Sequence, residues 1–123
     1  MFQNDYVMKI IQQFVQALIG IVKLRKAEQY EEAEKEIQTA SRFYLKINPE
    51  LLMMGSEEWL LDQIDEVERR MIAADLLYEQ GLIQEGKRNN GSSFFKRALT
   101  LYEAAGQLGE PKVEEVRAKL EAT

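Results

Sequence analysis

The chain has 123 residues, a formal net charge of −5, and neither cysteine nor histidine. The absence of both residue types excludes disulfides, zinc sites built on thiolate or imidazole, and Ser–His or Cys–His nucleophile pairs. The acidic balance disfavours nucleic-acid binding, because phosphate contacts need clustered lysine and arginine. With 46% hydrophobic residues, only two prolines and no sustained two-residue alternation, the composition predicts one all-α domain that spans residues 1–123.

The first predicted helix runs from Asn4 to Lys26 and is unusually apolar. Its apolar side chains cover roughly 220° of the circumference, against the ~100° that a surface helix needs. This breadth favours a helix in the centre of the core over a helix that contacts another protein. The uncharged run between Lys9 and Lys23 is too short to cross a bilayer, and no signal-peptide cleavage pattern is present. We therefore expect a cytoplasmic protein with no membrane partner.

The middle of the chain predicts shorter helical segments separated by breaks. A helix from Tyr30 to Ile47 ends ahead of Pro49, because the residue before a proline is pushed away from helical angles. The segment PELLMM that follows is a short helical turn. Gly55 breaks the pattern, and Ser56 is a good cap for the next helix.

The strongest pattern is a helical hairpin between Asp65 and Tyr102, which we expect to be the scaffold of the fold. Asp65 followed by Glu68 is typical of a helix start, and this favours a break near Gln63 over one continuous helix. A polar turn over residues 88–93 joins the two helices, which should be antiparallel neighbours. Three- and four-residue spacing predicts the core face of the first helix as Ile64, Val67, Met71, Ala74, Leu77, Tyr78 and Leu82. The corresponding face of the second helix contains Phe95, Ala98, Leu99, Tyr102 and Ala105.

The last predicted helix begins near Pro111, because proline is favoured in the first turn of a helix. Its only apolar anchors are Val113, Val116 and Leu120. We therefore expect it to dock loosely on the rest of the domain.

Two segments resemble the helix pairs of tetratricopeptide repeat (TPR) proteins. In that family the second helix of a pair carries a small residue, an aromatic residue four positions later and an alanine seven positions later. The chain has Ala33, Ile37 and Ala40 at these spacings, and again Gly91, Phe95 and Ala98. The first helix of each pair departs from the family, because it lacks the large apolar residue followed by glycine.

The order of the parts also resembles a family of small bacterial all-helical proteins whose function is uncharacterised. The shared features are an NDYVMKII helix, a QYEEAEKEI helix, an SEEWLL turn and a final hairpin with ADLLYEQG and KRALTLYEAA. The two resemblances imply five or six helices, in which TPR-like hairpins pack as a bundle or a short superhelix.

Acidic side chains are dense between Glu57 and Glu68, but they match no catalytic or metal-binding pattern. A hard cation would need a spaced Asp/Asn loop with a glycine turn, and no such loop is present. A solvated helix face with local lysine and arginine partners explains these carboxylates better. The segment GKRNNGSS likewise lacks the preceding strand and the spacing of a phosphate-binding loop. We therefore expect no enzyme activity, no catalytic residue, no cofactor and no metal.

The expected function is that of a non-enzymatic protein-interaction or adaptor module, which holds a peptide or a partner helix by apolar burial. The TPR resemblance implies a partner groove lined by Val15, Leu18, Val22, Arg25, Asp75 and Glu79. The apolar members of this set are equally suited to the core. The alternative is a self-associating homodimer that uses the first helix as its seam. Trp59 is either a plug that docks a short helix on the core or an exposed binding anchor.

Overall fold

The computed structural model describes residues 2–106 and 110–122, which contain seven α-helices and one π-helical segment. In chain order these are α1 (Phe2–Lys26), α2 (Tyr30–Ala40), the π-helical η1 (Ser41–Leu45), α3 (Pro49–Met54), α4 (Glu57–Gln63), α5 (Val67–Gly86), α6 (Ser92–Ala104) and α7 (Pro111–Glu121). The predicted all-α class is confirmed. The predicted number of five or six helices is wrong. Extended backbone at Gly55 and Ile64 makes α3, α4 and α5 three separate helices.

Local chemistry sets several of the helix ends. The side chain of Asn48 accepts a hydrogen bond of 2.9 Å from the backbone N–H of Glu50 at the start of α3. The hydroxyl of Ser56 accepts one of 3.1 Å from the backbone N–H of Trp59, which confirms the predicted cap of α4. Pro111 lies in the first turn of α7, which confirms that predicted start.

The second helix begins at Tyr30 as predicted and ends two residues before the predicted Ile47. The helix changes to π-helical geometry over η1 and ends at Leu45. Lys46 then adopts a left-handed backbone with φ of 57°, a conformation that a regular helix cannot continue. The hydroxyl of Ser41 donates to the carbonyl of Ile47 at 2.9 Å and holds the chain in this turn.

The predicted break after Gln63 is confirmed, but the predicted start at Asp65 is wrong. Helix α5 begins two residues later at Val67, and its N-cap residue Glu66 makes no side-chain capping bond. The break is instead held by Arg70, whose guanidinium donates to two carbonyls at the end of α4. Those carbonyls have no partner within their own helix, so the arginine replaces the missing bonds.

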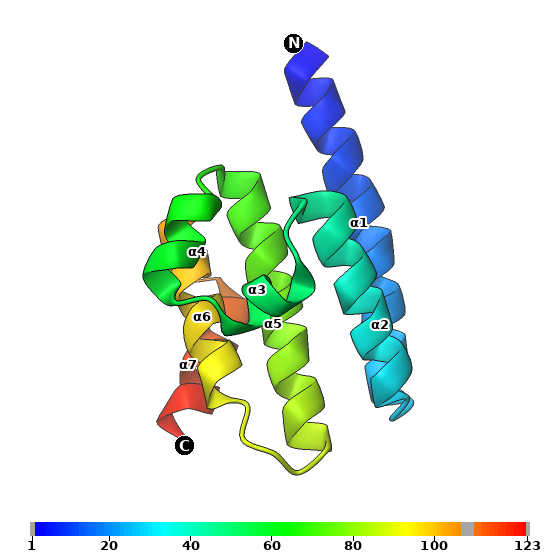
Figure 1. The fold of residues 1–123 in the computed structure, drawn as a ribbon, viewed down its shortest axis with the longest axis vertical. Helices are drawn as coiled ribbons and strands as arrows, with labels where there is room; N and C mark the ends of the chain where they lie inside the picture. The colour runs from blue at the N-terminus through cyan, green and yellow to red at the C-terminus, as the bar shows by residue number, and fades with distance from the viewer. Residues whose placement is uncertain (1, 107–109, 123) are drawn as a thin grey trace.

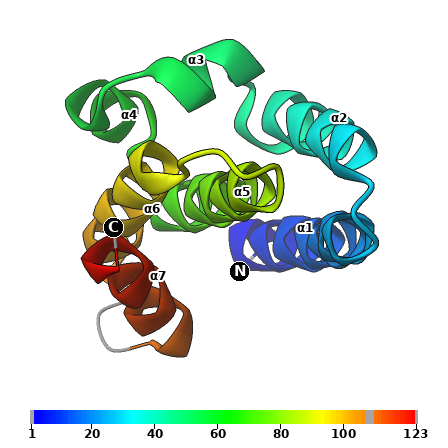
Figure 2. The ribbon, with the colours of Figure 1, turned by 90° about the horizontal axis from the view of Figure 1, so that it is seen from below.

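Helix α5 is the centre of the molecule. Figures 1 and 2 show α1 and α2 on one side of it, α6 and α7 on the other, and α3 and α4 along a third side. The buried residues of α5 are Ile72, Ala73, Ala74, Leu76, Leu77, Tyr78, Glu79, Gln80, Gly81 and Ile83. This burial extends around the helix, so the predicted core face, of which Ala74, Leu77 and Tyr78 are buried, is only part of the buried surface. Of that face, Val67 is 48% exposed, and Met71 and Leu82 are half-buried.

The polar residues buried on α5 are paired with neighbouring helices. Glu79 accepts a hydrogen bond of 2.6 Å from Arg25 of α1. Gln80 donates a hydrogen bond of 3.0 Å to Glu34 of α2. Because each polar group gains a partner, its burial does not leave an unsatisfied charge or amide in the core.

The hairpin of α5 and α6 is held by a close approach at two glycines. The fully buried ring of Phe95 lies on Gly81, where an added Cβ atom would come within 2.5 Å of the ring. Gly91 packs in turn on the backbone of Gly81. Tyr78 adds a tilted ring contact to Phe95, with 5.8 Å between centroids. The predicted hairpin is therefore present as the most extensive helix pair of the described fold.

Helix α7 covers the far side of α6. Val113 and Val116 are fully buried, and Leu120 packs against the same core from a half-buried position. The anchors named from the sequence are thus the ones that hold this helix, and two of them are enclosed completely.

Candidate protein-interaction surface

Helix α1 carries apolar side chains that the core does not fully enclose. Among its described side chains only Phe14 and Ile21 are buried. Six others fall within about 100° of the helix circumference and form what we call the outer stripe. The outer stripe consists of Met8, Ile11, Val15, Leu18, Ile19 and Val22. The prediction that this helix lies at the centre of the core is wrong, because α5 occupies that place.

The outer stripe is accessible along its length. Met8 is 56% exposed, Val15 is 43% exposed and Ile19 is 42% exposed, while the other three side chains are half-buried. Figure 1 shows that the N-terminal end of α1 projects beyond the other helices. Contiguous exposed apolar surface of this kind marks contact sites on soluble proteins.

By length and composition alone, Asp5–Lys26 is apolar enough to cross a membrane, with a mean hydropathy of 1.4. Core helices and signal sequences pass the same test, so it does not decide what covers α1. The expectation of no membrane partner stays a prediction.

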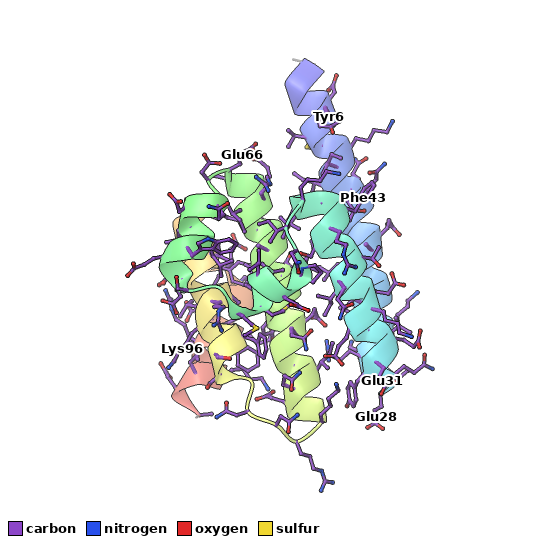
Figure 3. The ribbon with its side chains drawn as sticks, in the orientation of Figure 1. Tyr6, Glu28, Glu31, Phe43, Glu66 and Lys96 are labelled. Carbon is purple, nitrogen blue, oxygen red and sulfur yellow. The ribbon has the colours of Figure 1, made fainter. Side chains whose placement is uncertain are left out.

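An apolar pocket lies at the N-terminal end of the outer stripe, and we call it the end pocket. Its volume is about 270 Å³. Its walls come from α1, η1 and the first turns of α5, and they comprise Tyr6, Val7, Ile10, Ile11, Phe43, Tyr44, Lys46, Glu66, Glu68, Arg69 and Ile72. Figure 3 shows Tyr6, Phe43 and Glu66 around the upper end of the molecule, where this pocket opens. Ile11 belongs to both the pocket and the stripe, so the two form one continuous surface.

The π-helical turn shapes the end pocket. Tyr44 turns inward, where its ring meets the buried ring of Phe14 edge-on at 5.5 Å. Phe43 remains 55% exposed and stacks edge-on against Tyr44 at 4.8 Å. The ammonium of Lys46 lies 5.2 Å from the centroid of the Phe43 ring and covers part of it. Single π-helical turns occur frequently at functional sites, and here the turn leaves one aromatic ring at the rim.

The structure brings together only part of the predicted groove. Val15, Leu18 and Val22 share the outer stripe, with Leu18 also packed against the core. Arg25, on the next turn, pairs with the buried Glu79, as described above.

Asp75, the remaining member of the predicted groove, is held by other helices. It accepts hydrogen bonds from Tyr102 of α6 and, at 3.0 Å, from Lys112 of α7. Both predicted carboxylates therefore have partners within the chain. The apolar stripe remains as the part of the predicted groove that is open to another molecule.

One edge of the outer stripe is basic. At 100° per residue, Lys23 lies about 40° beyond Ile19 on the side of the stripe that faces away from α5, and Lys9 lies about 80° beyond Ile19 on the same side. Lys26 lies in line with the stripe at its C-terminal end. We call these three the basic edge. All three are exposed and make no ion pair with any described side chain. Asp5 lies at the N-terminal end of the same edge and is the only acidic residue of α1.

Two buried tyrosines lie behind this surface, where α5, α6 and α7 meet. Burial raises the pKa of Tyr102 well above its ordinary value, and the adjacent carboxylate of Asp75 raises it further. Burial also raises the pKa of Tyr78, and the nearby Glu115 adds to the effect. The Tyr78 hydroxyl has no hydrogen-bond partner among the described residues. Both groups therefore favour the protonated, neutral form in the folded state.

These pKa shifts predict that the fold is weakened at alkaline pH. Tyrosine in the unfolded chain ionises near pH 10, whereas the two buried tyrosines stay protonated to higher pH. Their contribution is therefore complete below about pH 10 and is lost as the pH rises above it. Each group lowers the free energy of unfolding by about 1.4 kcal/mol per pH unit in that range. Urea unfolding at a series of pH values checks the slope, and Tyr102→Phe should flatten it. An unchanged slope in that variant would contradict the assignment.

The acidic side chains between Glu57 and Glu68 are mostly exposed on α4 and the start of α5. The described residues contain no group of three His, Cys, Asp or Glu side chains placed to hold a metal ion. Trp59 is half-buried against the core, as expected for the plug rather than the exposed anchor. This region therefore offers no alternative to α1 as a site.

Searches of protein-family models, curated proteins and solved structures find no match to this chain.

Proposed function

We propose that this protein is a non-enzymatic protein-interaction module that binds a partner helix along the outer stripe of α1. The observation that carries the proposal is the apolar surface of that helix, where Met8, Val15 and Ile19 stay exposed beside Leu18, which packs on the core. Met8, Ile11, Val15, Leu18 and Val22 alternate three- and four-residue steps. This is the spacing with which one helix packs against another, since each side chain meets a hole on the facing helix.

The end pocket would receive a large apolar side chain of the partner. Apolar anchors that fill pockets provide most of the energy at protein interfaces, and aromatic residues such as Phe43 are frequent among them. The pocket adjoins the stripe at Ile11, so one bound helix could use both.

We further propose that the pairs α1–α2 and α5–α6 are degenerate TPR-like hairpins, of which α1 faces the partner. In support, the small residues of the second helices lie in the packed interior: Ala33, Ala40, Gly91 and Ala98 are all buried. The tight contact of Gly91 with Gly81 serves the same purpose as the small residues of the family, which is to let two helices approach closely.

Site-specific photo-crosslinking tests the proposal. Ile19 is replaced by the photoreactive amino acid p-benzoylphenylalanine, and the full-length protein is irradiated inside the cells that produce it. We expect higher-mass adducts from position 19. Gln13 is the control, because it is also exposed but lies roughly 120° away from Ile19 around the axis of α1, outside the outer stripe.

The outcomes separate the possibilities. Adducts at position 19 well above those at position 13 support a partner on the outer stripe, and their masses show whether it is a foreign protein or another copy of this chain. Equal or absent adducts at the two positions would refute the proposed function. Melting curves of both variants should match that of the parent protein, since each side chain is already exposed.

A further inference from the structure

The charge around the outer stripe identifies the kind of helix that fits it. We propose that the partner is an amphipathic helix with acidic residues along the flank that faces the basic edge. This inference rests on the proposed function and names the chemistry of its partner. Whether the partner is acidic is a separate question from whether a partner exists.

The first argument is the local reversal of charge. The whole chain has a net charge of −5, yet α1 carries four basic side chains and one acidic side chain. Half of the lysines and arginines elsewhere in the fold are engaged with carboxylates, as Lys112 is with Asp75 and Lys119 is with Glu85. The three lysines of the basic edge have no such partner among the described residues. Their positive field is therefore available to an anionic ligand.

The second argument is the one-sidedness of the charge. The edge of the outer stripe nearer α5 is closed by the ion pair of Arg25 and Glu79, whereas Lys23 lies beside the opposite edge and Lys9 lies further round on that side. A helix that lies on the stripe would thus meet protein on one flank and lysine on the other. A lipid surface would instead favour basic residues on both sides of the apolar face. The arrangement matches an amphipathic helix with one acidic flank.

A second copy of α1 fits the stripe less well. It would bring its own Lys9, Lys23 and Lys26 to the interface and only Asp5 as an acid. Two basic helices repel one another, and interfaces suppress wrong partners by this means. The charge therefore disfavours a homodimer in which the α1 helices of two copies pack against each other, although the apolar spacing would permit it.

Fluorescence anisotropy with a designed peptide tests the proposal. The probe is a labelled heptad peptide with leucine at its apolar positions and glutamate along one flank, and its counterpart carries lysine on that flank. We expect the intact protein to bind the acidic peptide and not the basic one, with affinity that falls as salt is added. The triple substitution Lys9→Glu, Lys23→Glu and Lys26→Glu should lower the affinity for the acidic peptide at least roughly tenfold. The same variant should bind the basic peptide.

The control removes the same amount of positive charge elsewhere. Lys35, Arg42 and Lys96 are exposed and lie off the stripe, so their replacement by glutamate should leave the affinity nearly unchanged. Equal loss in both triple variants, or no preference between the two peptides, would overturn the acidic-flank assignment. So would binding of anionic phosphatidylserine vesicles without peptide binding, or a stable dimer of the chain that Val15→Glu dissociates. Adducts at Ile19 would still stand in those cases, so the proposed function would survive such a failure.

Discussion

Replacing Phe95 with alanine should lower the free energy of unfolding by about 3–5 kcal/mol, the largest loss expected from any single change in this fold. The ring is fully buried between α5 and α6, and it lies on Gly81 and beside Tyr78. Alanine removes the apolar contact and leaves a cavity, which close-packed neighbours on two helices cannot fill. Domains of this kind have a total stability of about 5–15 kcal/mol, so the variant should unfold at a much lower urea concentration.

Phe43→Ala provides the matched control for that experiment. The chemical change is identical, but Phe43 is 55% exposed and packs mainly on the single ring of Tyr44. Its loss should cost no more than about 1.5 kcal/mol. Urea unfolding followed by circular dichroism compares the two variants. Similar losses for both would show that Phe95 does not hold the hairpin in the way described.

Gly91→Ala is expected to give the second large loss, about 1–3 kcal/mol. The new Cβ atom would lie 2.5 Å from the carbonyl oxygen of Gly81 and 3.2 Å from its Cα atom. These are backbone atoms of the central helix, so the clash cannot be relieved by rotating a side chain. The start of α6 would have to move away from α5, and the contact of Phe95 with Gly81 would loosen with it.

Gly20→Ala should have the opposite sign. No atom lies within 4 Å of the Cβ position at Gly20, and the residue is in the interior of α1. Alanine there should raise the free energy of unfolding by about 0.5–1 kcal/mol, because it reduces the freedom of the unfolded chain. Thermal melting of Gly20→Ala and Gly91→Ala shows whether each substitution raises or lowers the stability of the fold. A stabilising effect at position 91 would rule out the close approach of the two helices.

The helix ends were predictable wherever one residue decides them. Ser56 and Pro111 act through their own hydrogen-bonding capacity and ring geometry, which depend little on the rest of the fold. The helix start predicted at Asp65 was wrong for a different reason. The break there is held by Arg70 from the following helix, and no local pattern reveals a side chain that reaches backward to free carbonyls.

The identity of the central helix was not predictable from apolar periodicity. Periodicity counts large apolar residues, and by that measure α1 exceeds α5. Burial of α5 depends on small residues such as Gly81, and on polar residues that find partners, such as Glu79 with Arg25. From the sequence alone, small residues give no signal of burial and polar residues are predicted to be exposed. Their burial can be recognised only when the neighbouring helices are known.

The sequence predicts only the part of the candidate site that depends on spacing within one helix. The side chains of Val15 and Val22 share a face by spacing alone, so their grouping followed from the sequence. Asp75 could be grouped with Glu79 by spacing, but its pairing with Tyr102 and Lys112 depends on where α6 and α7 dock. The end pocket was missed because its walls come from three separated segments. The only local signal for it was the adjacent pair Phe43–Tyr44, of which a regular helix would bury one.

The position of α5 in the chain also constrains how the protein is made. Synthesis runs from the N-terminus, so α1 to α4 leave the ribosome before the helix on which they pack exists. Until α5 emerges, the apolar sides of α1 and α2 lack the helix that they pack against in the fold. The hairpin of α5 and α6, by contrast, joins segments that are close in sequence and closes quickly once both have emerged. The nascent chain therefore passes through a stage in which more than half of it is synthesised without a core, and chaperones that bind apolar helices would meet it there.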